Sequence, residues 1–278
     1  MSDPVLSPEP QPHGEASHEW YNLHASIPTR CRVPARHIAS KAFQEHPIDL
    51  DIEWVREEHA GFFDALSQIQ EPAERAQFFH DYALYRFWAN EPEEKRPDKK
   101  EQARRGYISL LRGWGYDSNS HSGAVLKGWA EQRFGLRPIW HGHLLESPEQ
   151  DEQYFSARLR GYLYGIGMQL DLLYCYCQDE LHRRHERELH LTLYRGCYDP
   201  DQHIVSRDDV GEVVEFNAVS SFTDDREIAW EFGSTVWRVK VPLSKIMLAP
   251  GILPPQLLQG EREYLVLGGN YRVKQLLF

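Results

Sequence analysis

The spacing of apolar residues changes at about residue 189, and this change constrains the fold more than any other feature of the chain. Before it, apolar residues recur every three or four positions, which is the period of an amphipathic helix. After it, short runs rich in β-branched, aromatic and leucine residues alternate with turn residues, as is typical of strands. We therefore expect an α+β fold, in which a helical N-terminal half precedes a mostly antiparallel, β-rich part.

The first part of the chain is expected to hold five helices. Their predicted ranges, taken from the recurring apolar positions, are 52–69, 78–88, 107–114, 123–134 and 149–181. Trp114 belongs to the apolar face of the third helix, which Gly113 and Gly115 are expected to stop. In the long fifth helix, the three glycines at 161, 165 and 167 are expected to let another element pack closely.

The second part is expected to be a sheet interrupted by one short helix. The predicted strands are residues 189–194, 212–217, 235–241, 263–267 and 271–277. The helix, at about 225–232, has Thr223 or Asp224 as its expected N-cap. We divide the chain into a flexible tail (1–25), a helical region (26–188) and a β-rich core (189–278), the last two expected to form one compact unit.

Composition and charge exclude several classes of protein. The chain has 42 acidic and 31 basic residues, a formal charge of −11. This excess argues against nucleic-acid binding by phosphate neutralisation and against docking on anionic lipid. No segment approaches the ~20 apolar residues of a membrane helix, and the first residues lack the pattern of a signal peptide. With four irregularly spaced cysteines, the chain is predicted to be cytoplasmic, with reduced thiols.

Motifs for a metal or a nucleotide cofactor are incomplete. No phosphate-binding loop of the G-x-x-x-x-G-K-[ST] type is present, and no full dinucleotide fingerprint follows a strand. Cys175 and Cys177 form C-x-C rather than the C-x₂-C of a zinc site. His182 and His185 lie one helical turn apart, but no carboxylate or cysteine completes a ligand set. We therefore predict a surface helix there and no metal site.

Two short pieces of the second part carry polar residues at strand ends. LTLYRG places Arg195 at the end of a strand with Gly196 after it. VSSFTDDREIAWEFG places Ser220, Ser221 and Thr223 on a strand that leads into a helix. Taken alone, such an arginine is usually a surface or salt-bridge residue, and a serine-rich strand usually meets solvent. Their order relative to a third piece is what indicates a site.

The third piece, QGEREYLVLGG, places Glu261 and Glu263 at the start of a strand. Because side chains alternate along a strand, the two carboxylates share one face, about 7 Å apart. Such a pair is usually a solvated edge, and it is costly unless a cationic group comes between the two charges.

The order arginine, S-x-T before a helix, then E-x-E before an apolar strand resembles that of the R-S-E group of ADP-ribosyltransferases, over residues 189–278. The whole chain is similar to the dinitrogenase reductase ADP-ribosyltransferases, through LTLYRG, SFTDDREIAWEFG, VPLSKI and GEREYLVLGGNYRVKQL. The resemblance implies transfer of ADP-ribose from NAD to an arginine of the nitrogenase iron protein, which switches nitrogen fixation off. It also implicates PII signalling proteins as partners.

The resemblance implies a role for each candidate residue. Cleavage of NAD makes an oxocarbenium-like centre, as in glycoside hydrolysis. Glu263 would bind the ribose 2′-hydroxyl beside that centre and stabilise the cation. Arg195 would contact the NAD phosphates and the nicotinamide ribose through its planar fork. The Gly196 backbone would meet the nicotinamide amide, because glycine permits a close approach.

The hydroxyl triplet departs from the family's pattern. Ser221 would hydrogen-bond Glu263 and Thr223 would support it, but Phe222 stands where the family usually has a small hydroxylated residue. Ser220 offers an alternative register, so which hydroxyl faces the glutamate is left open. Phe222 either stacks on the nicotinamide or packs in the core.

Glu261 is expected to select the acceptor. A guanidinium is a poor nucleophile because its pKa lies above ~12, and a carboxylate two residues before the catalytic one can hold it. Gln259 allows a competing Q-x-E pattern that ends at Glu261. We favour Glu263 because the strand follows it directly. The loop 248–260 would meet the protein substrate, although its leucines could equally be packing residues.

Two other functions fit the same residues. One keeps the chemistry and makes the chain an arginine-specific toxin or effector. The other is a non-catalytic module that binds NAD or a partner, against which the complete set of Arg195, Ser221 and Glu263 speaks.

Overall fold

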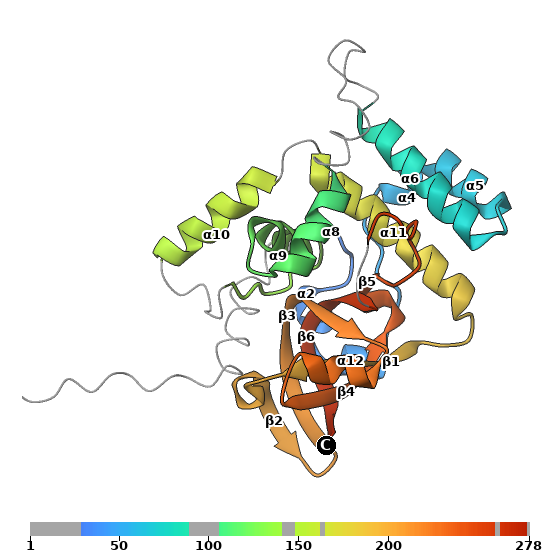
Figure 1. Cartoon of the computed structure of the whole chain (residues 1–278). Helices are drawn as coiled ribbons and strands as arrows, with labels where there is room; N and C mark the ends of the chain where they lie inside the picture. The colour runs from blue at the N-terminus through green and yellow to red at the C-terminus, as the bar shows by residue number, and fades with distance from the viewer. Residues whose placement is uncertain (1–28, 89–105, 141–147, 162–164, 259–261, 277–278) are drawn as a thin grey trace, which may run out of the picture.

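The computed structural model of this chain describes residues 29–88, 106–140, 148–161, 165–258 and 262–276. The predicted tail at 1–25 lies outside these residues. Figure 1 shows most helices of the first part gathered on one side of a sheet formed by the second part. The expected α+β fold is confirmed.

The described residues of the first part form the helices of this layer. They are α2 (Ala35–Ile38), α3 (Lys41–Glu45), α4 (Val55–Glu58), α5 (Ala60–Gln68), α6 (Pro72–Trp88), α8 (Tyr107–Tyr116), α9 (His121–Phe134), α10 (Pro148–Gly161) and α11 (Ile166–Arg184). None of the helices in the described ranges is long and apolar enough to cross a membrane.

The strands form one antiparallel sheet. They are β1 (His190–Cys197), β2 (Ile204–Asp208), β3 (Gly211–Thr223), β4 (Thr235–Pro242), β5 (Ile246–Leu248) and β6 (Glu263–Leu276), in the spatial order β2-β3-β1-β4-β6-β5. β3 also pairs with β6, so β3, β1, β4 and β6 form a closed circuit of pairings. The short helix α12 (Arg226–Glu231) packs against β1 and β4.

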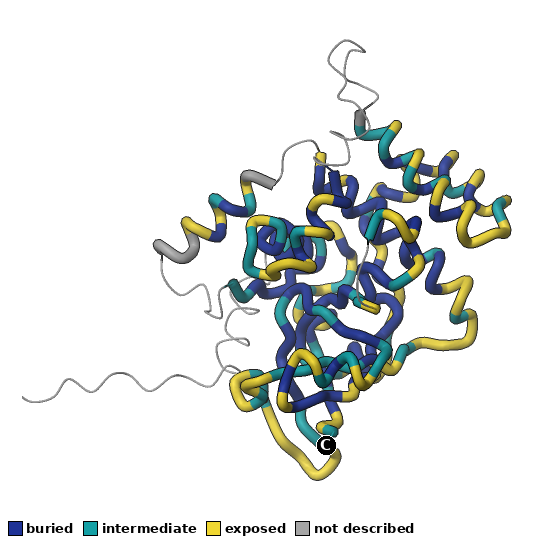
Figure 2. The backbone as a smooth tube through the Cα atoms, in the orientation of Figure 1, coloured by how far each residue is buried: buried dark blue, intermediate teal, exposed yellow. Residues whose placement is uncertain are grey.

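Buried residues gather where the helices meet the sheet, as Figure 2 shows. One hydrophobic cluster joins Trp129 of α9 and Tyr174 of α11 with Trp237 of β4 and Tyr271 of β6, each of them fully buried. The core is therefore shared between the helices and the sheet.

The prediction of one long helix over residues 149–181 is wrong. Two helices, α10 and α11, replace it, and Gly165 precedes α11 in the left-handed conformation, with φ of 65°. A glycine adopts this conformation at little cost, and it interrupts a helix. The glycine at 165 thus serves a change of direction rather than the close packing that we expected.

The two predicted strands at 263–267 and 271–277 are one strand, β6. The glycines between them form an irregularity in the ladder: the register between β3 and β6 shifts between Phe216 and Val219, opposite Gly269, whose φ is 105°. A side chain at Gly268 would clash with the Asn217 carbonyl. Glycines here permit a bulge inside a continuous strand, whereas the sequence pattern indicated a turn.

The end of one helix and the N-cap of another also differ from expectation. Helix α8 continues through Gly113 and Gly115 to Tyr116, because glycine lowers helix stability without ending a helix that packing supports. The N-cap of α12 is Asp225, whose carboxylate accepts from the backbone N–H groups of Glu227 and Ile228, so neither Thr223 nor Asp224 has that role.

Candidate active site

Glu263 and Ser221 meet where β3 and β6 pair. Thr223 is directly opposite Glu263 in the ladder and Ser221 is opposite Leu265, so Ser221 and Glu263 are diagonal neighbours. The Ser221 hydroxyl donates to Glu263 Oε1 at 2.5 Å. Both residues keep partly exposed surface. The structure thus brings together a carboxylate and a hydroxyl that a ligand can reach.

Trp114 reaches the same carboxylate from the helical region. Its indole N–H lies 3.0 Å from Ser221 Oγ and 3.1 Å from Glu263 Oε1. The sequence pattern predicts only an apolar residue of its helix at Trp114. Nothing in the spacing separates it from Leu110 and Leu111, because its polar partners lie more than 100 positions away along the chain.

Arg195 lies beside this pair at the end of β1. Its Nη1 donates to the Ser221 carbonyl at 2.6 Å, and its guanidinium lies 5.8 Å from the ring centre of Phe222 and 5.9 Å from that of Phe216. Burial lowers the pKa of Arg195 from its ordinary value, while Cys197 and Glu263 oppose that shift. The backbone contact and the two rings hold the guanidinium in one orientation.

The other two predicted hydroxyls bond elsewhere. Ser220 is buried and its Oγ lies 3.4 Å from the Asn217 carbonyl. The Thr223 hydroxyl accepts from the Asp225 N–H at 3.1 Å, where the chain turns into α12. Of the three, Ser221 is therefore the one that contacts Glu263.

Phe222 belongs to the core of the sheet. It is 3% exposed and meets Phe216 edge-on, with ring centres 5.1 Å apart. Of the two alternatives left open for Phe222, the geometry favours packing over stacking on a ligand.

Gly196 is approached closely by protein. A side chain built on it would clash with the Ala229 carbonyl and lie 2.9 Å from Phe232 C and 3.0 Å from Gly233 N. These atoms belong to the end of α12 and the residues that follow it. On the side where a Cβ would point, α12 rather than a ligand occupies the space that glycine leaves free.

Glu261 and Gln259 lie outside the described residues. Arg262, between the two glutamates, forms an ion pair with Asp224, with its Nε 2.9 Å from Oδ1, and Tyr264 donates to the same carboxylate at 3.2 Å. This contact fastens the start of β6 to the residue before the N-cap of α12.

The described part of the loop 248–260 is packed. Ile252 and Leu253 are buried, while Leu257 and Leu258 are half-buried against the core. Arg112 of α8 donates to the Leu257 carbonyl at 3.0 Å. The described leucines and the isoleucine of the loop are therefore packing residues, and the Arg112 hydrogen bond holds the loop next to α8.

Lys127 of α9 lies behind Trp114. Its Nζ is 6.0 Å from the centre of the Trp114 ring and donates to Asn119 Oδ1 at 3.1 Å. The residue is 1% exposed. Burial lowers the pKa of Lys127 to about 8, with Arg195 acting in the same direction and Asp117 against it.

The lowered pKa of Lys127 predicts a pH dependence of stability. Between pH ~8 and ~10.5 the folded protein binds fewer protons than the unfolded chain, so the free energy of unfolding rises with pH, by up to ~1.4 kcal/mol per unit. The substitution Lys127→Met should remove this rise. Urea unfolding of both proteins between pH 7 and 10.5 measures it, and equal slopes in the two proteins would contradict the prediction.

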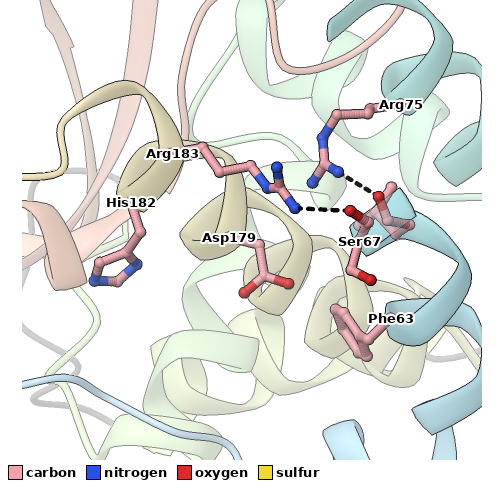
Figure 3. Close-up of a pocket in the computed structure, with 7 residues that line it drawn as sticks. Phe63, Ser67, Arg75, Asp179, His182 and Arg183 are labelled. Atoms are coloured by element: carbon pink, nitrogen blue, oxygen red, sulfur yellow. Dashed lines mark hydrogen bonds between the residues drawn. The ribbon is translucent and has the colours of Figure 1, made fainter. Parts of the chain in front are cut away.

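A separate pocket lies among the helices, away from the candidate site around Glu263. Figure 3 shows it lined from α5, α6 and α11, with Arg75 and Arg183 directed at the carbonyls of Leu66 and Ser67. No predicted site residue lines it.

The described residues hold no group of three or more histidine, cysteine or acidic side chains arranged for a metal. His182 of α11 instead has its Nδ1 2.7 Å from the Gln178 carbonyl, and its Nε2 3.4 Å from Asp49.

An antiparallel sheet that presents an arginine from β1, a serine from β3 and a glutamate from β6 has the arrangement of an R-S-E ADP-ribosyltransferase. The family model for dinitrogenase reductase ADP-ribosyltransferase matches residues 29–275, and this chain belongs to that family. It is 36% identical, over 253 residues, to the NAD(+)–dinitrogen-reductase ADP-D-ribosyltransferase of Rhodospirillum rubrum, covering 87% of this chain and 92% of that protein. No solved structure matches the chain.

Proposed function

We propose that this chain is an NAD-dependent mono-ADP-ribosyltransferase that modifies an arginine of the nitrogenase iron protein, inactivating it and switching nitrogen fixation off. The Ser221–Glu263 contact, with Arg195 beside it, is the observation that carries the proposal. We base the assignment of the substrate on the Rhodospirillum rubrum relative, because the name of that protein states that it acts on dinitrogen reductase.

Glu263 would stabilise the reacting centre. Nicotinamide leaves as a neutral base, so the step needs no acid to protonate it, and the site requires one carboxylate beside the ribose. Both donors from the described residues reach Oε1, so we assign Oε2 to the ribose 2′-hydroxyl. That contact strengthens as positive charge develops on the ribose, and losing such a group typically costs ~10²–10³ in rate.

Arg195 would bind the pyrophosphate. One of its N–H groups is committed to the Ser221 carbonyl, and its planar fork carries further donors, which suit phosphate oxygens. The rings of Phe216 and Phe222 hold that fork in place. NAD is the co-substrate in this scheme.

Glu261 would receive the acceptor arginine. Its carboxylate would hold the guanidinium and take up the proton that leaves when the nitrogen attacks the ribose. The assignment of Glu261 rests on the family resemblance, because Glu261 lies outside the described residues.

The test incubates the full chain with labelled NAD and purified iron protein. Label on one arginine of the iron protein is expected, together with slow release of nicotinamide when the iron protein is omitted. Bound but intact NAD would instead favour a non-catalytic binding module.

The substitution Glu261→Gln separates the two carboxylates. We expect it to keep NAD cleavage near the wild-type rate and to lower arginine transfer ~10²-fold or more, because a neutral amide cannot take up the guanidinium proton. Nicotinamide release and label transfer are measured on the same protein. Equal loss of both activities would contradict the division of roles.

A cytoplasmic location and regulation by a PII signalling protein are further parts of this proposal. The PII assignment rests on the family resemblance, and co-purification of the two proteins at defined nucleotide concentrations tests it.

A further inference from the structure

The catalytic glutamate of the proposed reaction accepts hydrogen bonds from two directions. Ser221 donates to Oε1 from the sheet, and Trp114 donates to the same oxygen from α8. The indole N–H also lies within hydrogen-bond distance of the Ser221 hydroxyl. The indole nitrogen, the Ser221 hydroxyl and Glu263 Oε1 thus form a triangle of mutual contacts.

Trp114 is itself held firmly. It is 4% exposed, and the Lys127 ammonium lies over its ring. Helix α8 is anchored at its start, where the Tyr107 N–H donates to Gln169 of α11, and in its middle, where Arg112 donates to the Leu257 carbonyl. The indole N–H is therefore a fixed donor, in addition to the Ser221 hydroxyl, at the start of β6.

We propose that Trp114 is a positioning residue for the ADP-ribosyltransferase reaction, acting with Ser221 to hold Glu263 Oε1 so that Oε2 meets the ribose 2′-hydroxyl. The inference rests on the proposed function. A glutamate side chain loses rotamer freedom when it is ordered, and this loss of conformational entropy is unfavourable. Two converging donors order it before NAD binds, so the cost does not fall on the transition state.

The substitution Trp114→Phe keeps an aromatic ring in the core and removes the N–H. We expect kcat for NAD cleavage without acceptor to fall ~10–100-fold, while the Kd for NAD changes less than about twofold. The split follows because the contact orients a group that acts in the transition state and does not itself touch NAD. Should this variant unfold, β-(3-benzothienyl)alanine at position 114 keeps the bicyclic shape and likewise lacks the N–H.

Trp129→Phe is the matched control. Trp129 is another buried tryptophan of the helical region, and its indole N–H donates at 2.7 Å to a carboxylate, that of Asp171. Its loss should lower the melting temperature and leave kcat unchanged. An equal fall of kcat in both variants would show that the effect of Trp114 is only structural, and would overturn the inference.

A double-mutant cycle with Ser221→Ala completes the test. Because both donors act on one oxygen, the loss of kcat in Trp114→Phe/Ser221→Ala should be smaller than the product of the two single losses. If the two single losses of kcat multiply in the double variant, or if kcat is unchanged in Trp114→Phe, the inference about Trp114 is overturned and the proposed function still stands. A wild-type protein that does not cleave NAD would overturn the proposed function as well.

Discussion

Replacing Glu263 by glutamine is expected to lower kcat for ADP-ribose transfer ~10²–10³-fold. Glutamine has nearly the same size, and its carbonyl can still accept from Ser221 and Trp114. It has no negative charge to stabilise the oxocarbenium-like centre, so the loss should fall on kcat rather than on the affinity for NAD. Labelled NAD with the iron protein measures transfer, and calorimetry measures NAD binding.

Glu231→Gln is a suitable control for this experiment. Glu231 is an exposed residue at the end of α12, and the substitution makes the same change of charge away from Ser221. It should leave turnover unchanged. Wild-type turnover in Glu263→Gln would mean that the carboxylate at 263 does not act in the reaction.

Replacing Gly196 by alanine should destabilise the protein severely. The new methyl group would overlap the Ala229 carbonyl and press on the backbone of Phe232 and Gly233. Backbone atoms cannot rotate away as a side chain can, so β1 and α12 must separate. Overpacking typically costs ~1–3 kcal/mol, and we expect at least the upper end of that range. Chemical denaturation measures the change in the free energy of unfolding.

Gly61→Ala makes the same chemical change in open space. Gly61 lies in α5, and nothing would lie within 4 Å of the new methyl group. Since alanine is the better helix former, this variant should be more stable by ~0.5–1 kcal/mol. If Gly196→Ala kept wild-type stability and lost only NAD binding, the close approach of a ligand, rather than of α12, would explain the glycine.

Local pattern was sufficient for elements whose ends carry their own signals. The helix predicted at 123–134 is α9, with Ser120 as N-cap and Gly135 in the left-handed conformation after it. The strand predicted at 235–241 is β4, whose alternation of buried and exposed residues follows the sequence closely. In both cases the neighbours along the chain determine the structure.

Local pattern failed where glycines have several possible roles. At Gly165 the chain changes direction between two helices, whereas at Gly269 a strand continues through a bulge. The same residue type permits a turn, a break or a bulge, and the partner strand or helix selects among them. That selection depends on contacts between distant residues.

The candidate site shows the same division. Arg195, Ser221 and Glu263 were found from their order along the chain, because each stands at a strand end with a distinctive neighbour. Which hydroxyl faces the glutamate depends on the pairing of β3 with β6. A shift of one residue would turn Ser220 toward the carboxylate instead.

By itself, the sequence determined the fold class and the acidic charge, since these reside in periodicity and composition. Its short motifs, through their resemblance to a known family, indicated the family and the three residues proposed for the chemistry. Only the tertiary structure decided the register that joins Ser221 to Glu263, the packing of α12 on Gly196, and the reach of Trp114 into the site. The physical reason is that a hydrogen bond or a clash depends on distances in space. Here residues more than 30 positions apart along the chain set those distances.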